Sequence, residues 1–164
     1  MKLASKLFFI TFLAILLASC NDNKSKWEAY ENKIIDDYVK TLGDTIYTLN
    51  PSGLYYIELF PGTGISPINN DSVYFKYKAS FLDFVVFNST TPDSVPSKAK
   101  IGSDDLISGV DEGLKYMKEG GRAKLIIPSK LAYGLYGIPN IVPANTPILV
   151  TLELKKVIPG TGKQ

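Results

Sequence analysis

Few side chains in this chain are suited to making and breaking bonds. It has no histidine and a single cysteine, Cys20, which excludes Ser-His-Asp and Cys-His catalysis and histidine-bound zinc. The tight acidic pairs Asp104 with Asp105 and Asp111 with Glu112 match neither a calcium loop nor the separated carboxylates of a glycosidase. We therefore interpret them as surface carboxylates, some supporting a nearby helix N-terminus, and expect neither a metal nor another cofactor.

Cys20 follows a leader that is typical of secreted proteins. Two lysines precede a largely apolar run of 13 residues, 7–19, whereas a transmembrane helix needs about 20. The tetrad "LASC" resembles the bacterial lipobox, in which the cysteine becomes the lipidated N-terminus. We expect a signal peptide over 1–19 and a lipidated tether over 20–24, with each buried acyl methylene contributing ~0.8 kcal/mol to anchoring. An unmodified cysteine in an ordinary cleaved leader is the alternative.

The expected location is the bacterial cell envelope, on the periplasmic side or at the outer membrane. Loss of Lys2 and Lys6 with the leader takes the 18 basic residues to 16, equal to the 16 acidic ones. No basic cluster interleaves with aromatic residues, so we expect no nucleic-acid partner. The remaining 145 residues fit one domain with an extension.

Residues 25–43 are predicted to form an amphipathic helix with its stop. Ser25 and Glu28 have capping-box spacing, and Gly43 ends the helix. Its apolar face consists of Trp27, Tyr30, Ile34, Tyr38 and Leu42, widened by Ile35 and Val39. We expect this face to pack on the chain's own domain. A homodimer or another partner through this helix is the alternative.

Residues 45–158 are predicted to form the main domain. Alternating or β-branched and aromatic strands, such as residues 45–50, 53–60 and 72–81, are separated by Pro and Gly. One helix, residues 109–117, interrupts them and carries an apolar stripe at i, i+4 and i+7. This order predicts an α+β fold in which an antiparallel, strongly twisted sheet wraps around one short α-helix.

The most informative segment is residues 109–154, which reads helix, Gly turn, strand, long Pro/Gly loop and strand. It resembles the C-terminal half of an FKBP-type prolyl isomerase domain, and the likeness extends over residues 52–157. The resemblance implies an apolar cleft that receives a proline ring. Its clients would be proline-containing polypeptides.

The resemblance also implies roles for individual residues. Tyr77 and Phe87 correspond to the aromatic walls, and Tyr133 in "AYG" corresponds to the loop tyrosine whose hydroxyl binds a carbonyl. Leu106 and Ile107 match the pair before the helix, and the Ile107 N–H would hold a ligand carbonyl. The aliphatic pair at the loop tip matches Ile141 and Val142.

The chain departs from the family pattern at four pocket positions. Val110 stands where the pocket floor usually has tryptophan, Ser97 and Val150 each replace an aromatic residue, and Asn88 replaces an aspartate. Losing one aromatic contact of about 100 Å² weakens proline binding by about 2.5 kcal/mol. The turn dipeptides within residues 78–84 also differ, so we expect that hairpin to be built differently.

Two hypotheses follow from these matches and departures. The first is a lipid-anchored prolyl isomerase that twists X-Pro bonds of exported proteins in an apolar pocket. The second is a catalytically weak or inactive FKBP-like module that binds extended segments or belongs to an envelope machine, as some FKBP-like lipoproteins of gliding bacteria do.

Overall fold

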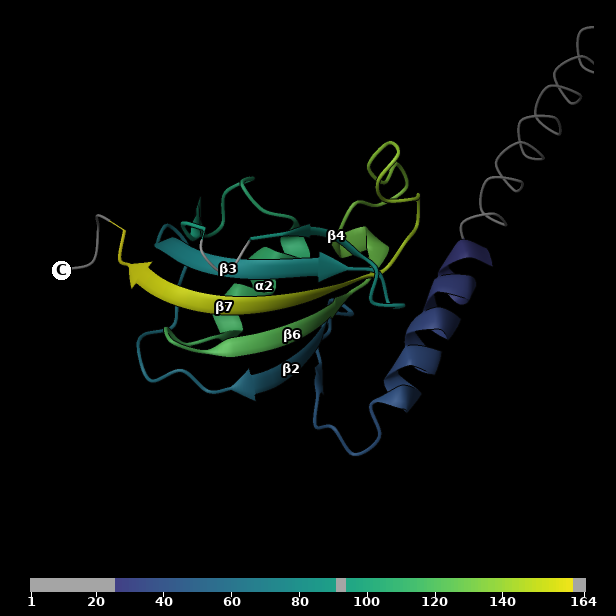
Figure 1. The fold of residues 1–164 in the computed structure, drawn as a ribbon, viewed down its shortest axis with the longest axis horizontal. Coiled ribbons are helices and arrows are strands. Elements are labelled where there is room, and N and C mark those ends of the chain that lie inside the picture. Colours follow the sequence, from purple (N-terminus) through teal and green to yellow (C-terminus); the bar gives the residue numbers. More distant parts are fainter. Residues whose placement is uncertain (1–25, 91–93, 161–164) are drawn as a thin grey trace, which may run out of the picture.

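The computed structural model describes residues 26–90 and 94–160. The predicted signal peptide, Cys20 and Ser25 lie outside these residues. The described strands form one antiparallel sheet of seven strands in the order β1-β2-β6-β7-β3-β4, with β5 paired to β3 beside β4 (Figure 1). The strands are β1 (Thr48–Leu49), β2 (Tyr55–Phe60), β3 (Ser72–Ser80), β4 (Val86–Ser89), β5 (Ser97–Lys100), β6 (Arg122–Ile127) and β7 (Ile148–Ile158).

The longest strand, β7, lies inside the sheet between β6 and β3. Its residues alternate between the two faces, because successive side chains of a strand point in opposite directions. Leu152 packs in the larger core cluster, while Leu149 belongs to a separate cluster on the other face. Both faces of this strand are therefore covered along part of its length.

Helix α2 (Ser108–Tyr116) packs on one face of the sheet, which we call the α2 face (Figure 1). The predicted stripe is confirmed, since Val110, Leu114 and Met117 are all buried. Glycine is required on the side nearest the sheet, where a Cβ at Gly109 or Gly113 would lie 2.4 Å from a side-chain carbon of β6. The two glycines thus allow the close helix–sheet contact, and the predicted α+β fold is confirmed.

A second helix, residues 26–41, packs on the opposite face of the sheet. We call it the N-terminal helix. Ile35 and Tyr38 are buried against Ile57, Ile126 and Leu149, so packing on the chain's own domain is confirmed.

The predicted apolar face of the N-terminal helix is wrong in its first turns. Trp27 and Tyr30 are 52% and 58% exposed. The buried positions are Glu31, Ile35 and Tyr38, because the first turns lie beside an open groove instead of the sheet core. Hydrophobic spacing alone does not tell where the covering surface ends.

One predicted strand is shorter than expected, and one predicted irregular connection is confirmed. The strand expected over residues 45–50 is confined to β1, since Ile46 is 89% exposed and only Thr48 and Leu49 pair with β2. The β3–β4 connection is irregular, as expected, with a β-bulge at the end of β3. Phe84 adopts a left-handed conformation with φ of 69°, which usually favours glycine.

Candidate functional site

A cavity of about 320 Å³ opens at one end of the α2 face. It lies between β3, β7, the start of α2 and the loop that joins β6 to β7, residues 128–147. Its lining is formed by Phe75, Tyr77, Ala79, Asn88, Ser97, Lys98, Asp105, Leu106, Ile107, Val110, Tyr133, Ile148, Val150 and Leu152. Most of these side chains are apolar, which suits a flat hydrophobic ring.

Most of the residues that the sequence singled out come together here. The eight that line the cavity are Tyr77, Asn88, Ser97, Leu106, Ile107, Val110, Tyr133 and Val150. Phe87 is not among the lining residues, but its ring meets the Tyr133 ring edge-on at 6.3 Å between centroids. Phe87 therefore contacts the cavity wall through the Tyr133 ring.

The predicted aliphatic pair of the loop does not line the cavity. Val142 is buried in the core, and Ile141 is 52% exposed. A bridge between Ile138 and Val142 gives this segment strand-like pairing, so neighbouring side chains point in opposite directions. Leu135 and Tyr136 are more exposed than Ile141.

Strand alternation explains four lining residues that the sequence did not indicate, namely Phe75, Ala79, Ile148 and Leu152. Phe75 precedes Tyr77 by two positions on β3, and the two rings lie 6.0 Å apart. Ile148 and Leu152 flank Val150 on β7 at the same spacing. All four lie two positions from Tyr77 or Val150 and therefore point to the same face of the sheet. Lys98 and Asp105, at polar positions of the lining, have no comparable signal.

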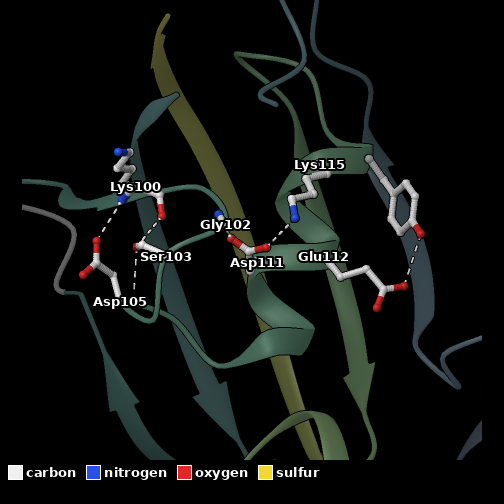
Figure 2. A network of polar contacts seen from close by, with 8 residues as sticks. Lys100, Gly102, Ser103, Asp105, Asp111, Glu112 and Lys115 are labelled. Carbon is white, nitrogen blue, oxygen red and sulfur yellow. Dashed lines mark hydrogen bonds and ion pairs between the residues drawn. The ribbon is translucent and has the colours of Figure 1, made fainter. Parts of the chain in front are cut away.

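A polar network fixes the segment that leads into α2. The Asp111 carboxylate accepts the Gly102 N–H at 2.7 Å and pairs with Lys115 at 2.6 Å (Figure 2). The Asp105 carboxylate accepts the Lys100 N–H at 3.1 Å, and this bond, followed by Ser103, holds the pKa of Asp105 below its ordinary value. These carboxylates are therefore not merely solvated, because they hold residues 100–105 ahead of Leu106 and Ile107.

Ile107 is the N-cap residue of α2 and has extended backbone angles. Its carbonyl accepts the N–H groups of Val110 and Asp111. The helix thus starts at the cavity wall, with Val110 one turn further on forming part of the lining. A β-branched valine leaves this wall smaller than an aromatic ring would.

Tyr133 enters the cavity from the loop that follows β6. The loop starts with a short 3-10 turn, η1 (Ser129–Leu131). Burial, followed by the nearby Tyr77, raises the pKa of Tyr133 above its ordinary value. Its hydroxyl therefore keeps its proton at neutral pH and is able to donate a hydrogen bond.

A larger groove, about 660 Å³, lies between the N-terminal helix and the same loop. Carboxylate, amide and hydroxyl side chains contribute to its lining, and none of the residues predicted to bind proline is there. We therefore assign the proline-sized site to the smaller, apolar cavity. Size alone favours the groove, but eight of the predicted residues line the cavity and none lines the groove.

Within residues 26–90 and 94–160, no group of three or more His, Cys, Asp or Glu side chains is arranged to hold a metal ion. No helix in this part of the chain combines the length and the apolarity that a membrane crossing requires.

The family model and the similar proteins that match this chain all point to one family. Residues 64–160 match the model of the FKBP-type peptidyl-prolyl cis-trans isomerases. The chain is 34% identical over 140 residues to the FKBP-type peptidyl-prolyl cis-trans isomerase FkpA of Escherichia coli K12, which covers 85% of this chain and 48% of that protein. It is 35% identical over 106 residues to peptidyl-prolyl cis-trans isomerase Fkbp12 of Drosophila melanogaster, covering 64% of this chain and 98% of that protein.

Solved structures agree with these matches. The crystal structure of a peptidyl-prolyl cis-trans isomerase from Pseudomonas syringae superposes with a TM-score of 0.69 at 28% identity, covering 80% of this chain and 96% of that one. The chain spans about half the length of the FkpA proteins that it matches.

Proposed function

Because the chain belongs to the FKBP-type peptidyl-prolyl cis-trans isomerase family, we propose that it catalyses cis–trans isomerisation of X-Pro bonds in polypeptides. Its substrates in this proposal are unfolded or extended segments of exported proteins. Uncatalysed isomerisation of such bonds takes tens to hundreds of seconds, slow enough to limit folding.

The reaction needs little from the protein in the way of functional groups. The barrier of about 18–20 kcal/mol arises from the partial double-bond character of the C–N bond. A twisted imide is less polar than the planar one, so transfer to a dry apolar site favours the twisted form. Interactions that form only with the rotated carbonyl lower the barrier further.

In this proposal the cavity residues divide these tasks. Tyr77, Phe75 and Val150 surround the proline ring. The Tyr133 hydroxyl donates to one substrate carbonyl, and the Ile107 N–H donates to another. Asn88 borders the same cavity and orients the substrate through its amide.

The observation that carries this proposal is the convergence on one apolar cavity of eight residues that the family resemblance had singled out. They come from β3, β4, β5, β7, the start of α2 and the loop after β6. Since they span residues 77–150 of the chain, their meeting is a property of the folded site and not of local sequence.

The direct test is isomerisation of Leu-Pro and Phe-Pro peptides by the soluble protein spanning residues 21–164. The Tyr133→Phe variant should lower kcat/KM about five- to tenfold, as expected for one lost hydrogen bond in the transition state. Tyr136→Phe is the matched control, because Tyr136 is on the same loop but 90% exposed, and it should retain full activity.

The outcome also separates the two function classes. If folded parent protein gives no acceleration, the isomerase proposal is wrong. The absent aromatic rings at Val110 and Val150 would then favour a non-catalytic module that binds proline-containing segments. Titration of such a peptide against the parent and Tyr133→Phe proteins would measure that binding.

We also propose that Cys20 carries a lipid anchor that holds the domain in the bacterial cell envelope. The support is the leader and lipobox-like sequence before Cys20. Labelling with a fatty-acid analogue should mark the parent protein and not a Cys20→Ala variant; labelling of both would refute the anchor.

A homodimer through the N-terminal helix is a separate proposal. Its support is the exposure of Trp27 and Tyr30 on the first turns of that helix. Light scattering of the protein spanning residues 21–164 tests it, and a monomer at high concentration would refute it.

A further inference from the structure

Glu31 is a buried carboxylate for which the isomerisation chemistry has no use. It is on the N-terminal helix and only 7% exposed. One of its oxygens accepts the backbone N–H of Ser129, and the other accepts the Ser129 hydroxyl at 2.9 Å. Ser129 is itself 5% exposed, so this contact joins two buried groups that are 98 positions apart in the chain.

General stabilisation is a poor explanation for this carboxylate. Removing a charge from water is unfavourable unless hydrogen bonds replace the lost solvation, and well-packed apolar residues often stabilise such a position equally well. Ile35, one turn further along the same helix, packs in an apolar cluster. A carboxylate bonded through both oxygens instead gives a fixed geometry at the residue that it binds.

Ser129 is the residue from which the Tyr133 turn is built. Its carbonyl accepts the Ala132 N–H at 2.9 Å and the Gly134 N–H at 2.8 Å. These two donors are the chain neighbours of Tyr133 on either side. Glu31 thus binds the N–H and hydroxyl of the same residue whose carbonyl holds the backbone around Tyr133.

The arrangement of the larger elements agrees with this chain of contacts. In Figure 1 the loop between β6 and β7 rises at the same end of the sheet as the N-terminal helix. Pro128, Ser129 and Gly134 form one side of the groove, and Glu31 with its helical neighbours forms the other. The helix therefore contacts the loop on the side away from the apolar cavity.

We propose that Glu31 is a positioning residue for the isomerase. Its carboxylate fixes Ser129, Ser129 fixes the turn that contains Ala132 and Gly134, and the turn fixes the Tyr133 hydroxyl at the substrate carbonyl. The N-terminal helix is then part of the working enzyme. This proposal rests on the proposed isomerase activity and goes beyond it, since it assigns a catalytic contribution to a residue outside the cavity.

The central experiment compares Glu31→Ala, Glu31→Gln and the control Glu28→Gln in isomerisation of a Leu-Pro peptide. Glu31→Ala removes both acceptors and should lower kcat/KM about fivefold. Glu31→Gln should stay within twofold of the parent, because its amide oxygen accepts the Ser129 N–H and its NH2 group donates to the hydroxyl. Glu28 is exposed, one turn earlier, and Glu28→Gln should have no effect.

A double-mutant cycle separates positioning from a general structural effect. If Glu31 acts through the Tyr133 hydroxyl, Glu31→Ala should change kcat/KM less than twofold in a Tyr133→Phe background. An equal loss in both backgrounds would overturn the proposal. So would unchanged activity of folded Glu31→Ala in the parent background.

Amide hydrogen exchange makes the test independent of activity. The Ala132 and Gly134 amides should exchange at least tenfold faster in Glu31→Ala, while amides of β3 and β7 keep the parent rate. If the parent protein is not an isomerase, the proposed function fails, and this exchange pattern still decides whether Glu31 fixes the turn. Unchanged exchange at both amides would overturn the positioning role. If Glu31→Ala does not fold, Ser129→Ala replaces it in this experiment. Ser129→Ala removes only the hydroxyl hydrogen bond, so the Ala132 and Gly134 amides should exchange faster than in the parent, but by a smaller factor.

Discussion

The two faces of the sheet differ in how much of the fold rests on each. Among the described residues, the α2 face contains a cluster of 18 buried residues drawn from β3, β5, β6, β7, α2 and the neighbouring loops. The cluster on the opposite face has five, two of them from the N-terminal helix. The apolar cavity is lined in part by residues of the larger cluster. The N-terminal helix, which packs in the smaller cluster, contacts the loop between β6 and β7 through Glu31 and Ser129.

Together with the proposed role of Glu31, this difference assigns folding mainly to the α2 face and positioning of the site to the opposite face. A large continuous core makes the α2 face the source of most apolar stabilisation. The small cluster is sufficient to dock one helix but contributes much less. The position of the helix is therefore expected to change without unfolding of the sheet.

The largest effect is expected on the α2 face. Leu125 is fully buried and packs against α2 beside Gly113. Leu125→Ala should lower the free energy of unfolding by about 3–5 kcal/mol, because a cavity remains where the side chain was. Urea denaturation monitored by far-UV circular dichroism measures this loss of unfolding free energy. A loss below 1 kcal/mol would mean that the α2 face does not dominate stability.

The helix contact should respond less and more locally. Ile35 is 2% exposed in the smaller cluster, and Ile35→Ala should weaken helix docking by about 2 kcal/mol. Trp27 fluorescence should then change at lower urea than the circular dichroism of the sheet. Coincident transitions, shifted as far as in Leu125→Ala, would show that the two faces unfold as one unit.

Alkaline pH should lower the free energy of unfolding through one tyrosine on each face, by less than the core substitutions do. Burial, followed by Glu58, raises the pKa of Tyr56 beside α2 to about 12, and burial also raises the pKa of Tyr38 on the N-terminal helix. Because the folded state favours the neutral phenols, their stabilisation is present below pH 10, the ordinary pKa, and is lost as pH rises toward 12.

The measurement is the unfolding free energy at several values from pH 8 to pH 11. The decrease in unfolding free energy between pH 8 and pH 11 should become smaller in Tyr56→Phe than in Tyr38→Phe. The reverse order, or a parent protein whose stability does not fall above pH 10, would contradict the assignment.

The smallest effect is expected on the bare half of the opposite face. Beyond the helix, the described strands there carry Lys76, Lys78, Arg122 and Lys124, which alternate with residues of the α2 face. Lys78→Gln should change the unfolding free energy by less than about 0.5 kcal/mol, as is usual for an exposed side chain. A loss above 1 kcal/mol in urea denaturation would show that this half also supports the fold.

The features that could be predicted from the sequence are those with short-range signals or family spacing. The stripe of Val110, Leu114 and Met117 predicted α2, and strand alternation predicted β2 and β3. The order of elements within residues 109–154 predicted β6 and β7. The spacing of Tyr77, Val110 and Tyr133 predicted residues that meet in one cavity. In each case either the period of the element or the family pattern carried the information.

The features that could not be predicted depend on contacts between distant segments. Nothing near Glu31 indicates that Ser129 is its partner, and a glutamate on a helix is ordinarily solvated. Trp27 and Tyr30 have the spacing of a buried face, yet the surface that would cover them is absent at that end of the described sheet. The separation of Ile141 from Val142 depends on the pairing of Ile138 with Val142; the Pro139-Asn140 turn signal between them marks a turn but does not tell which of the two side chains is buried.

The position of β7 inside the sheet also has a consequence for the order of folding. This strand follows all the other described strands in the chain, yet it pairs with both β6 and β3. Residues of β3 must therefore wait for partners much later in the chain, such as Val73 for Val157, and contacts of such long sequence separation slow folding. During synthesis, β3 and β6 each keep one unpaired edge until β7 arrives. Closure of the sheet, and with it assembly of the cavity, is thus a late event in folding.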